Sequence, residues 1–217
     1  MAVALFDLDE TLLAGDSDYL WGQFLVQKGV VDGDTYERTN RLFYEQYLNG
    51  TLDIVAFSRF AFHPLSEHPL EVLQQWREEF VEQKIQPIVL NKGKELLEQH
   101  RHAGDKLVII TSTNRFITEP IAALYNVHQL IATEPEMIEG KYTGELRSPC
   151  FANHKVDRLN EWLTDSGNNL SGSYAYSDSH NDIPLLENAA NSIAVDPDDK
   201  LKAHAIKNNW KIMSLRD

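Results

Sequence analysis

The stretch MAVALFDLDETLLAGDSD, residues 1–18, places an apolar run directly before two aspartates, Asp7 and Asp9, which Thr11 follows. The run predicts a short buried strand over residues 2–7 that delivers both carboxylates to one place. Like charges a few ångströms apart repel by about 4 kcal/mol at an effective dielectric constant near 20. A fold that keeps such charges together usually has a cation or a proton to share between them.

The overall composition narrows the class of protein. The chain has 217 residues, 33 acidic and 20 basic, with a formal net charge of -13. This length fits one large domain or a core with an insertion, and an acidic surface repels nucleic acid and anionic membranes. The single cysteine, Cys150, excludes an internal disulfide and suits a reducing compartment. Because the sequence also lacks a signal-peptide pattern and a membrane-length apolar run, we expect a cytoplasmic protein without a nucleic-acid or membrane partner.

Further strand-like runs alternate with helical patterns along the chain. We expect a three-layer α/β fold with a Rossmann-like parallel sheet, because such alternation produces βαβ units. Residues 141–146 predict a small hairpin, since Gly140 and Gly144 mark turns. The expected strands cover residues 107–111, 129–133, 173–178 and 192–195, and the expected helices cover residues 90–103, 116–125, 154–163 and 183–190.

One region, residues 14–86, breaks this alternation. Apolar and aromatic residues recur there at helical spacing, with no convincing strand pattern. Its aromatic side chains are expected to be core residues more often than ligand contacts. The sequence therefore predicts an α/β core made of residues 1–13 and 87–217, with residues 14–86 as a helical cap inserted after the first strand.

Polar residues gather where the predicted strands end, which is the edge where open parallel sheets bind ligands. Asp7 and Asp9 follow the first strand, residues 111–114 (TSTN) follow the second, residues 178–182 (DSHND) follow a third, and Lys155 opens a helix. Carboxylates suit Mg²⁺, hydroxyls and backbone amides at a strand–helix turn bind phosphate, and a lysine offsets transition-state charge. One aspartate could attack phosphorus while its neighbour donates and then accepts a proton.

Each of these features also has a purely structural interpretation. Two aspartates after a strand often form turns, and residues 111–114 and 178–182 could be helix caps. Lys155 alone could be a solvated helix residue. Their occurrence together, in a workable order and at strand ends, favours a site for a divalent cation and a phosphate.

Four segments resemble the motifs of the haloacid dehalogenase-like hydrolases: FDLDET (6–11), VIITST (108–113), Lys155 and YSDSHND (176–182). The place of the helical insertion resembles the phosphoserine phosphatase-like branch. This resemblance implies a Mg²⁺-dependent phosphatase, a phosphoric monoester hydrolase that acts on a small phosphorylated metabolite through an aspartyl-phosphate. Phosphoryl transfer to an acceptor other than water and a non-catalytic Mg²⁺- or phosphoprotein-binding module are the alternatives. The sequence leaves the oligomeric state open.

The resemblance implies a role for each matching residue. Asp7 would be the nucleophile, and Asp9 would be the general acid and base, with its backbone carbonyl on Mg²⁺. Asp178 would be the second carboxylate ligand of the metal, and Asp182 would support the metal site through water or through Lys155. The residues that would bind the phosphate are Thr111, Ser112, Lys155 and Asn181.

The resemblance also points to two positions that affect substrate choice. Phosphoserine phosphatases have a glutamate where this chain has Asp16, and their cap arginine falls at Ala61, two residues from Arg59. A retained acid without a matched arginine favours a phosphorylated amino alcohol that lacks a carboxylate, such as histidinol phosphate, over phosphoserine. Asp16 could equally cap a helix that begins near Asp18.

Overall fold

The strand β1 (Val3–Phe6) is buried, as its apolar sequence predicts, and it lies in the middle of the sheet. The structure, a computed structural model, describes residues 2–216. β1 pairs in parallel with β2 on one side and β5 on the other, and only the pairing of β3 with β4 is antiparallel among the described strands. The sheet order is β4 (Lys141–Ser148), β3 (Gln129–Ile138), β2 (Lys106–Asn114), β1, β5 (Tyr174–Ser177), β6 (Asn191–Val195) and β7 (Lys211–Met213).

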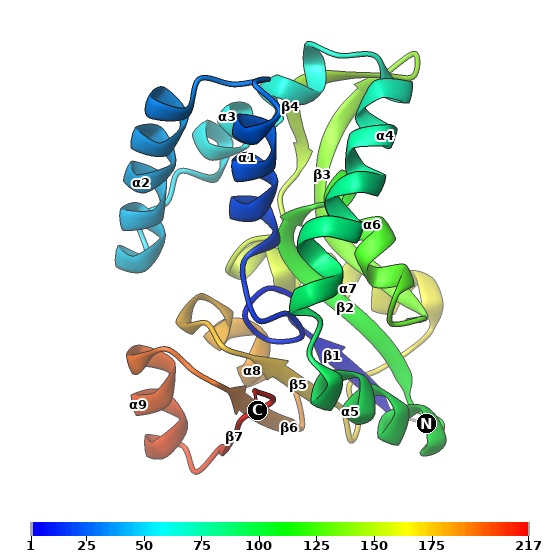
Figure 1. The fold of residues 1–217 in the computed structure, drawn as a ribbon. Helices are drawn as coiled ribbons and strands as arrows, with labels where there is room; N and C mark the ends of the chain where they lie inside the picture. The colour runs from blue at the N-terminus through cyan, green and yellow to red at the C-terminus, as the bar shows by residue number, and fades with distance from the viewer. Residues whose placement is uncertain (1, 217) are drawn as a thin grey trace.

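Helices cover both faces of this sheet (Figure 1). Alternate residues of β1 enter different apolar clusters, with Ala4 and Phe6 on one face and Val3 and Leu5 on the other. The three-layer α/β prediction is therefore confirmed. The helices of this part are α5 (Asn91–His102), α6 (Arg115–Ala123), α7 (Asn153–Ser166), η3 (His180–Asp182), α8 (Ile183–Asn188) and α9 (Asp199–Lys207).

The chain between β1 and α5 is helical and lies above the sheet in Figure 1. We call residues 17–88 the helical segment. Its two ends lie side by side, because Leu13 forms an antiparallel bridge with Val89 and the amide of Ala14 donates to the carbonyl of Ile88 at 2.8 Å. The division into core and cap stays a prediction. The elements are α1 (Ser17–Gln27), α2 (Gly33–Asn49), α3 (Ile54–Ser66), α4 (Leu70–Phe80), the π-turn η1 (Val81–Ile85) and the 3₁₀ turn η2 (Gln86–Ile88).

The helices of this segment are held very unequally. Trp21 stacks on Phe24 and packs edge-on against Phe80, so α1 and α4 share an aromatic core. α2 has one buried residue, Tyr36, whose ring covers Gly22 of α1 so closely that a Cβ there would lie 2.3 Å from it. α2 is therefore the lightly packed helix of the segment.

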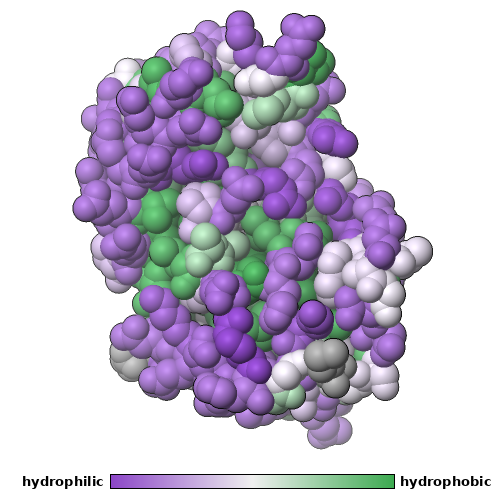
Figure 2. Space-filling model, turned by 90° about the vertical axis from the view of Figure 1, so that its right-hand side faces the viewer, coloured by the Kyte–Doolittle hydropathy of each residue, from purple (hydrophilic) through white to green (hydrophobic). Residues whose placement is uncertain are grey.

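The hairpin of β3 and β4 extends beyond the sheet and meets α3 of the helical segment (Figure 1). At this junction Arg59 of α3 donates to Glu145 of β4 at 2.8 Å, and both side chains are exposed. The face of the molecule that lies on the right in Figure 1 is mostly hydrophilic, with hydrophobic residues gathered midway between its top and bottom (Figure 2). The hairpin thus connects the sheet to the helical segment at a second place, away from residues 13 and 89.

Candidate active site

The carboxyl ends of β1 and β5 meet at one point and hold the first aspartates of the site. The amide of Asp7 donates to the carbonyl of Tyr176 at 2.9 Å, which continues the β1–β5 ladder to the aspartate itself. The hydroxyl of Thr11 donates to Asp178 at 2.8 Å and accepts from the amide of Asp178 at 3.1 Å. These bonds place Asp7 and Asp178 beside each other on neighbouring strands.

Lys155 lies beneath this point, between two carboxylates. Its Nζ is 3.0 Å from Oδ1 of Asp7 and 2.7 Å from Oδ2 of Asp182, which also accepts from the hydroxyl of Ser177 at 2.7 Å. Lys155 is 1% exposed, Asp7 is 7% exposed and Asp182 is 2% exposed. The interpretation of Lys155 as a solvated helix residue is wrong, because the lysine is a buried ionic partner.

The acids of this cluster outnumber its cation. Burial raises the pKa of Asp7 to about 7, Lys155 lowers it, and the negative charges of Asp182 and Asp9 raise it further. Burial and the charge of Asp7 raise the pKa of Asp178 well above its usual value. Burial alone would lower the pKa of Lys155, but the negative charges of Asp182 and Asp7 raise it, so the lysine remains charged. One lysine therefore leaves excess negative charge at the site.

Asp9 occupies a different environment from Asp7. Its Oδ1 accepts from the amide of Ser17 at 2.7 Å, and its Oδ2 accepts from the hydroxyls of Thr113 at 2.8 Å and Thr111 at 3.4 Å. Burial and the charge of Asp16 raise the pKa of Asp9 to about 6, although the hydrogen bonds from Ser17 and Thr113 lower it. The carboxylate is fixed between α1 and β2, with a pKa that suits proton transfer near neutral pH.

The remaining residues of segments 111–114 and 178–182 lie at separate places around the site. Asn114 caps α6 by accepting from the amide of Ile117 at 3.2 Å, so the helix-cap interpretation holds for this residue. Ser112 lines the large cavity described below, whereas the hydroxyl of Thr111 faces Asp9. The side-chain amide of Asn181 lies 3.5 Å from the carbonyl of Tyr47, at the contact with the helical segment.

A cavity of about 610 Å³ lies between the helical segment and the sheet edge. Carboxylates, aromatic rings and the strand-end residues Ser112 and Thr113 share its wall. Its acidic residues are Glu10, Asp16, Asp18 and Glu37, its aromatic residues are Tyr19, Phe43, Tyr44, Tyr47, Phe57 and Phe151, and Arg41 is the basic residue among its described lining.

Of the two residues predicted to affect substrate specificity, one lines the cavity and the other does not. Asp16 lines it and also caps α1, accepting from the amide of Tyr19 at 2.8 Å, so both of its predicted roles are compatible with the structure. Arg59 is not among the lining residues and pairs with Glu145 instead. Sequence reasoning missed Asp18, whose pKa is raised to about 8 by burial and by Asp16 and Asp9. Its proximity to Asp9, which accepts a hydrogen bond from the neighbouring amide of Ser17, becomes visible only in the folded chain.

The donor set can be compared with the needs of Mg²⁺. No group of three or more His, Cys, Asp or Glu side chains among residues 2–216 is arranged as a metal cage. Mg²⁺ does not need one, because it keeps several waters and takes only one or two protein carboxylates. Asp7 and Asp178 provide such a pair, with uncompensated negative charge. The residues therefore fit a hydrated magnesium ion.

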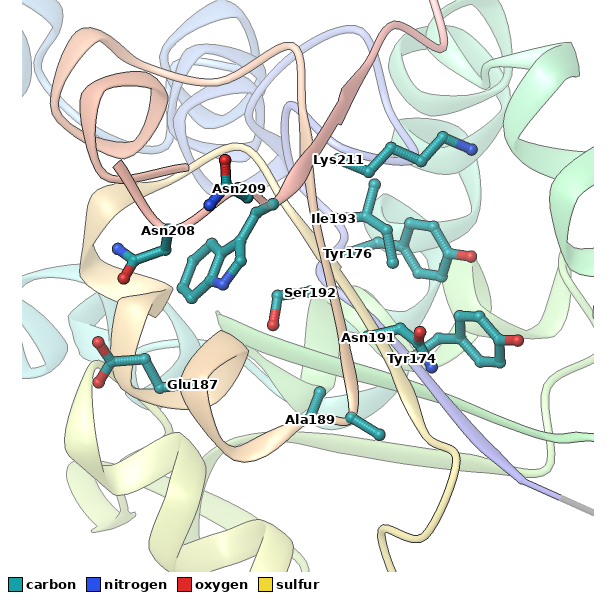
Figure 3. Close-up of a pocket in the computed structure, with 12 residues that line it drawn as sticks. Tyr174, Tyr176, Glu187, Ala189, Asn191, Ser192, Ile193, Asn208, Asn209 and Lys211 are labelled. Atoms are coloured by element: carbon teal, nitrogen blue, oxygen red, sulfur yellow. The ribbon is translucent and has the colours of Figure 1, made fainter. Parts of the chain in front are cut away.

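A second hollow, of about 580 Å³, lies at the other end of the sheet (Figure 3). Tyr174 and Tyr176 lie on one side of β6, and Glu187 and Asn208 lie on the other. None of the predicted site residues lines this hollow. The cavity beside Ser112 and Thr113 is therefore the candidate active site.

Comparison with known proteins agrees with this geometry. Residues 4–187 match the family described as haloacid dehalogenase-like hydrolase. The chain belongs to this family. The predicted family and enzyme class are thereby confirmed: the chain is a phosphoric monoester hydrolase that acts on a small phosphorylated metabolite, and Mg²⁺ and an aspartyl-phosphate are general features of its family. No helix in the described part of the chain is long and apolar enough to cross a membrane.

Two curated relatives within the family have phosphatase names. The histidinol-phosphatase of Neisseria meningitidis is 38% identical over 219 residues, which cover 99% of each chain. The phosphoserine phosphatase SerB1 of Mycobacterium tuberculosis is 28% identical over 222 residues, covering 99% of this chain and 71% of that one.

Two solved structures support the fold. A protein with unknown function from Bordetella pertussis Tohama I superposes with a TM-score of 0.93 at 39% identity, with 99% of each chain covered. A phosphoserine phosphatase solved as a phospho-aspartyl intermediate analogue has a TM-score of 0.71 at 18% identity, covering 99% of this chain and 93% of that one. At that identity the second likeness shows the fold alone.

Proposed function

We propose that the chain is a Mg²⁺-dependent phosphatase of histidinol phosphate, or of a phosphorylated amino alcohol very similar to it, with residues 14–86 as a cap over the site. The observation that carries this proposal is the acidic and aromatic wall of the cavity beside Ser112 and Thr113. The relative named histidinol-phosphatase, which matches along its whole length, supports the same choice.

The cavity wall suits a cationic substrate. Histidinol phosphate has an ammonium group, which Asp16 and Asp18 would attract, and an imidazole ring, which aromatic faces such as that of Tyr47 would contact. Phosphoserine is the second candidate, because Arg41 also lines the cavity and could pair with a substrate carboxylate. The surplus of acids over this arginine favours the substrate without a carboxylate.

The reaction would use the two aspartates of the first motif in turn. An oxygen of Asp7 attacks phosphorus, and the bond between phosphorus and the ester oxygen breaks while Asp9 gives its proton to the leaving alcohol. Asp9 then takes a proton from water, whose oxygen attacks the phosphorus, and the Asp7–phosphorus bond breaks to release inorganic phosphate. The separate hydrogen-bond environments of the two carboxylates support these separate roles.

The phosphate and the metal would share the surrounding residues. Lys155 would hold Asp7 and the phosphoryl oxygens, with Thr111, the amide of Ser112 and the side chain of Asn181 as further phosphate contacts. Asp7, the backbone carbonyl of Asp9, and Asp178 would hold Mg²⁺, and Asp182 would support the metal through water or through Lys155. When bound, the ion supplies the positive charge that the acidic cluster lacks.

Turnover of a phosphate-ester panel tests this proposal. We expect kcat/KM with Mg²⁺ to be highest for histidinol phosphate, lower for phosphoserine and lowest for p-nitrophenyl phosphate. Asp16→Asn and Asp18→Asn should each lower kcat/KM for histidinol phosphate by about 10- to 100-fold, since each removes a carboxyl that ionises beside the substrate ammonium, which lowers its raised pKa on binding. Asparagine keeps the helix cap at position 16, so the fold is preserved.

A matched control separates recognition from general charge effects. Asp165→Asn removes an exposed acid of α7, outside the cavity, and should leave all three rates unchanged. Equal loss of activity toward p-nitrophenyl phosphate in the Asp16 and Asp18 variants would contradict a substrate-recognition role. A preference for phosphoserine would overturn the choice of substrate while leaving the phosphatase assignment intact.

A further inference from the structure

The C-terminal end of α2 is fastened to the core by polar contacts. The hydroxyl of Tyr47 lies 2.7 Å from the hydroxyl of Ser179, in the loop between β5 and η3. One residue further, the carbonyl of Leu48 accepts from Nζ of Lys200, on α9, at 2.6 Å. Aromatic rings join α2 to α3, with Phe43 packed against Phe57 and Phe60, whereas these polar contacts join its C-terminal end to the core.

Ser179 is also the end of a buried hydrogen-bond chain that leads to Asp7. Its amide donates to the hydroxyl of Ser177 at 3.2 Å, and that hydroxyl donates to Asp182 at 2.7 Å. Asp182 accepts from Lys155, which also donates to Asp7. All five residues of this chain are buried. A displacement of Ser179 would therefore disturb Asp182 and Lys155, and through Lys155 the proposed nucleophile Asp7.

The ring of Tyr47 belongs to the same arrangement. It lines the cavity, and its centroid lies 5.9 Å from that of Phe151, which is buried just before α7, the helix that carries Lys155. Tyr47 thus contacts the core on both sides of the site, through its hydroxyl at Ser179 and through its ring at Phe151. Gly29 and Gly50, both at positive φ, lie in the connections that flank α2, where the backbone can turn.

We infer that Tyr47 is a positioning residue: its hydrogen bond to Ser179 holds α2 over the cavity and fixes the loop that carries Asp182, which in turn holds Lys155 of α7 against Asp7. Lys200 supports the same position of α2 through the carbonyl of Leu48. This inference rests on the proposed active site at Asp7 but not on the choice of substrate. It assigns Tyr47 a role in positioning the nucleophile and none in the chemical step.

Hydrogen exchange of the α2 amides tests the fastening without any need for turnover. Tyr47→Phe keeps the ring and deletes the hydroxyl, and a hydrogen bond between neutral groups shifts an equilibrium by about fivefold. We expect α2 to exchange about fivefold faster in this variant, with faster exchange also in the Ser179 loop and no change in the remaining chain. Tyr174→Phe, which deletes a hydroxyl at the opposite end of β5, is the matched control and should leave α2 unchanged.

A double-mutant cycle identifies the partner. Ser179→Ala should speed exchange of α2 to the same extent as Tyr47→Phe, and the double variant should show no further increase. In the same series kcat/KM should fall by about fivefold for Tyr47→Phe, with little change in the thermal midpoint. Unchanged exchange of α2, independent effects of the two substitutions, or uniformly faster exchange along the chain would each overturn the inference. If the chain hydrolysed no phosphate ester, the proposed function would fail while the exchange data still decided whether α2 is fastened by Tyr47.

Discussion

Replacing Lys155 with methionine removes the cation that lies between Asp7 and Asp182 while keeping a side chain of similar length. At 3.0 and 2.7 Å, each ion pair has a Coulomb attraction of about 6 kcal/mol at an effective dielectric constant of 20, and desolvation offsets most of it. Removing one partner of a buried pair nevertheless costs about 3–5 kcal/mol, because the remaining charge is uncompensated. We expect the free energy of unfolding of the Lys155→Met variant to fall by this amount at pH 8 without metal.

Urea denaturation in the presence of EDTA measures this loss. With a slope near 3 kcal/mol per molar, the midpoint should fall by about 1–2 M. The loss should be smaller at pH 5.5 than at pH 8, because the raised pKa of Asp7 lets its carboxyl take up a proton when the lysine is absent. Lys202→Met, which changes an exposed lysine of α9, is the control and should leave the midpoint unchanged. A loss below about 1 kcal/mol at pH 8, or one independent of pH, would refute the argument that Lys155 compensates buried charge.

Three further predictions concern metal, proton transfer and packing. Burial raises the pKa of Asp7 from 3.8 to about 7, so the metal-free protein should lose stability as pH rises from about 4 to 7. Mg²⁺ should therefore raise the thermal midpoint more at pH 8 than at pH 5.5. An equal rise at both pH values would contradict this. Thr113→Val removes a donor that lowers the pKa of Asp9, so the basic limb of the kcat/KM profile should move up by about one pH unit, whereas an unmoved limb would argue against Asp9 as the acid. Gly22→Ala should displace the ring of Tyr36 and lower the free energy of unfolding by about 1–3 kcal/mol in urea, and a neutral result would show that α2 is not packed through this contact.

The sequence was sufficient for the sheet and for the polar cluster at its edge. The apolar run before Asp7 predicted a buried strand, and the alternation of strands and helices predicted a mainly parallel sheet, whereas the order of the strands is known only from the folded chain. Because parallel strands end at a common edge, residues that follow β1 and β5 had to meet there. The strand pattern missed β7, which has three residues, and the helix pattern missed α9.

The cavity wall could not be predicted in the same way. Its residues come from helices whose mutual packing depends on contacts such as Gly22 against Tyr36, which no local spacing encodes. Counting along the chain therefore suggested Arg59, which the folded chain pairs with Glu145, and missed Arg41, which lines the cavity. The aromatic residues divide for the same reason: Trp21 and Phe24 of α1 and Phe80 of α4 are core, while Tyr19 of α1 and several aromatic residues of α2 and α3 line the cavity.

The most direct test of the central claim is the mass of the acid-quenched Asp9→Asn variant after mixing with Mg²⁺ and p-nitrophenyl phosphate. The p-nitrophenolate group leaves without a proton, so the first step proceeds, while the loss of the Asp9 base slows release of phosphate. We predict one phosphoryl group per chain, on the peptide that contains Asp7, and none when Asp7→Asn is added. Release of p-nitrophenol with no phosphoryl group on Asp7, or with the group on another residue, would contradict the account.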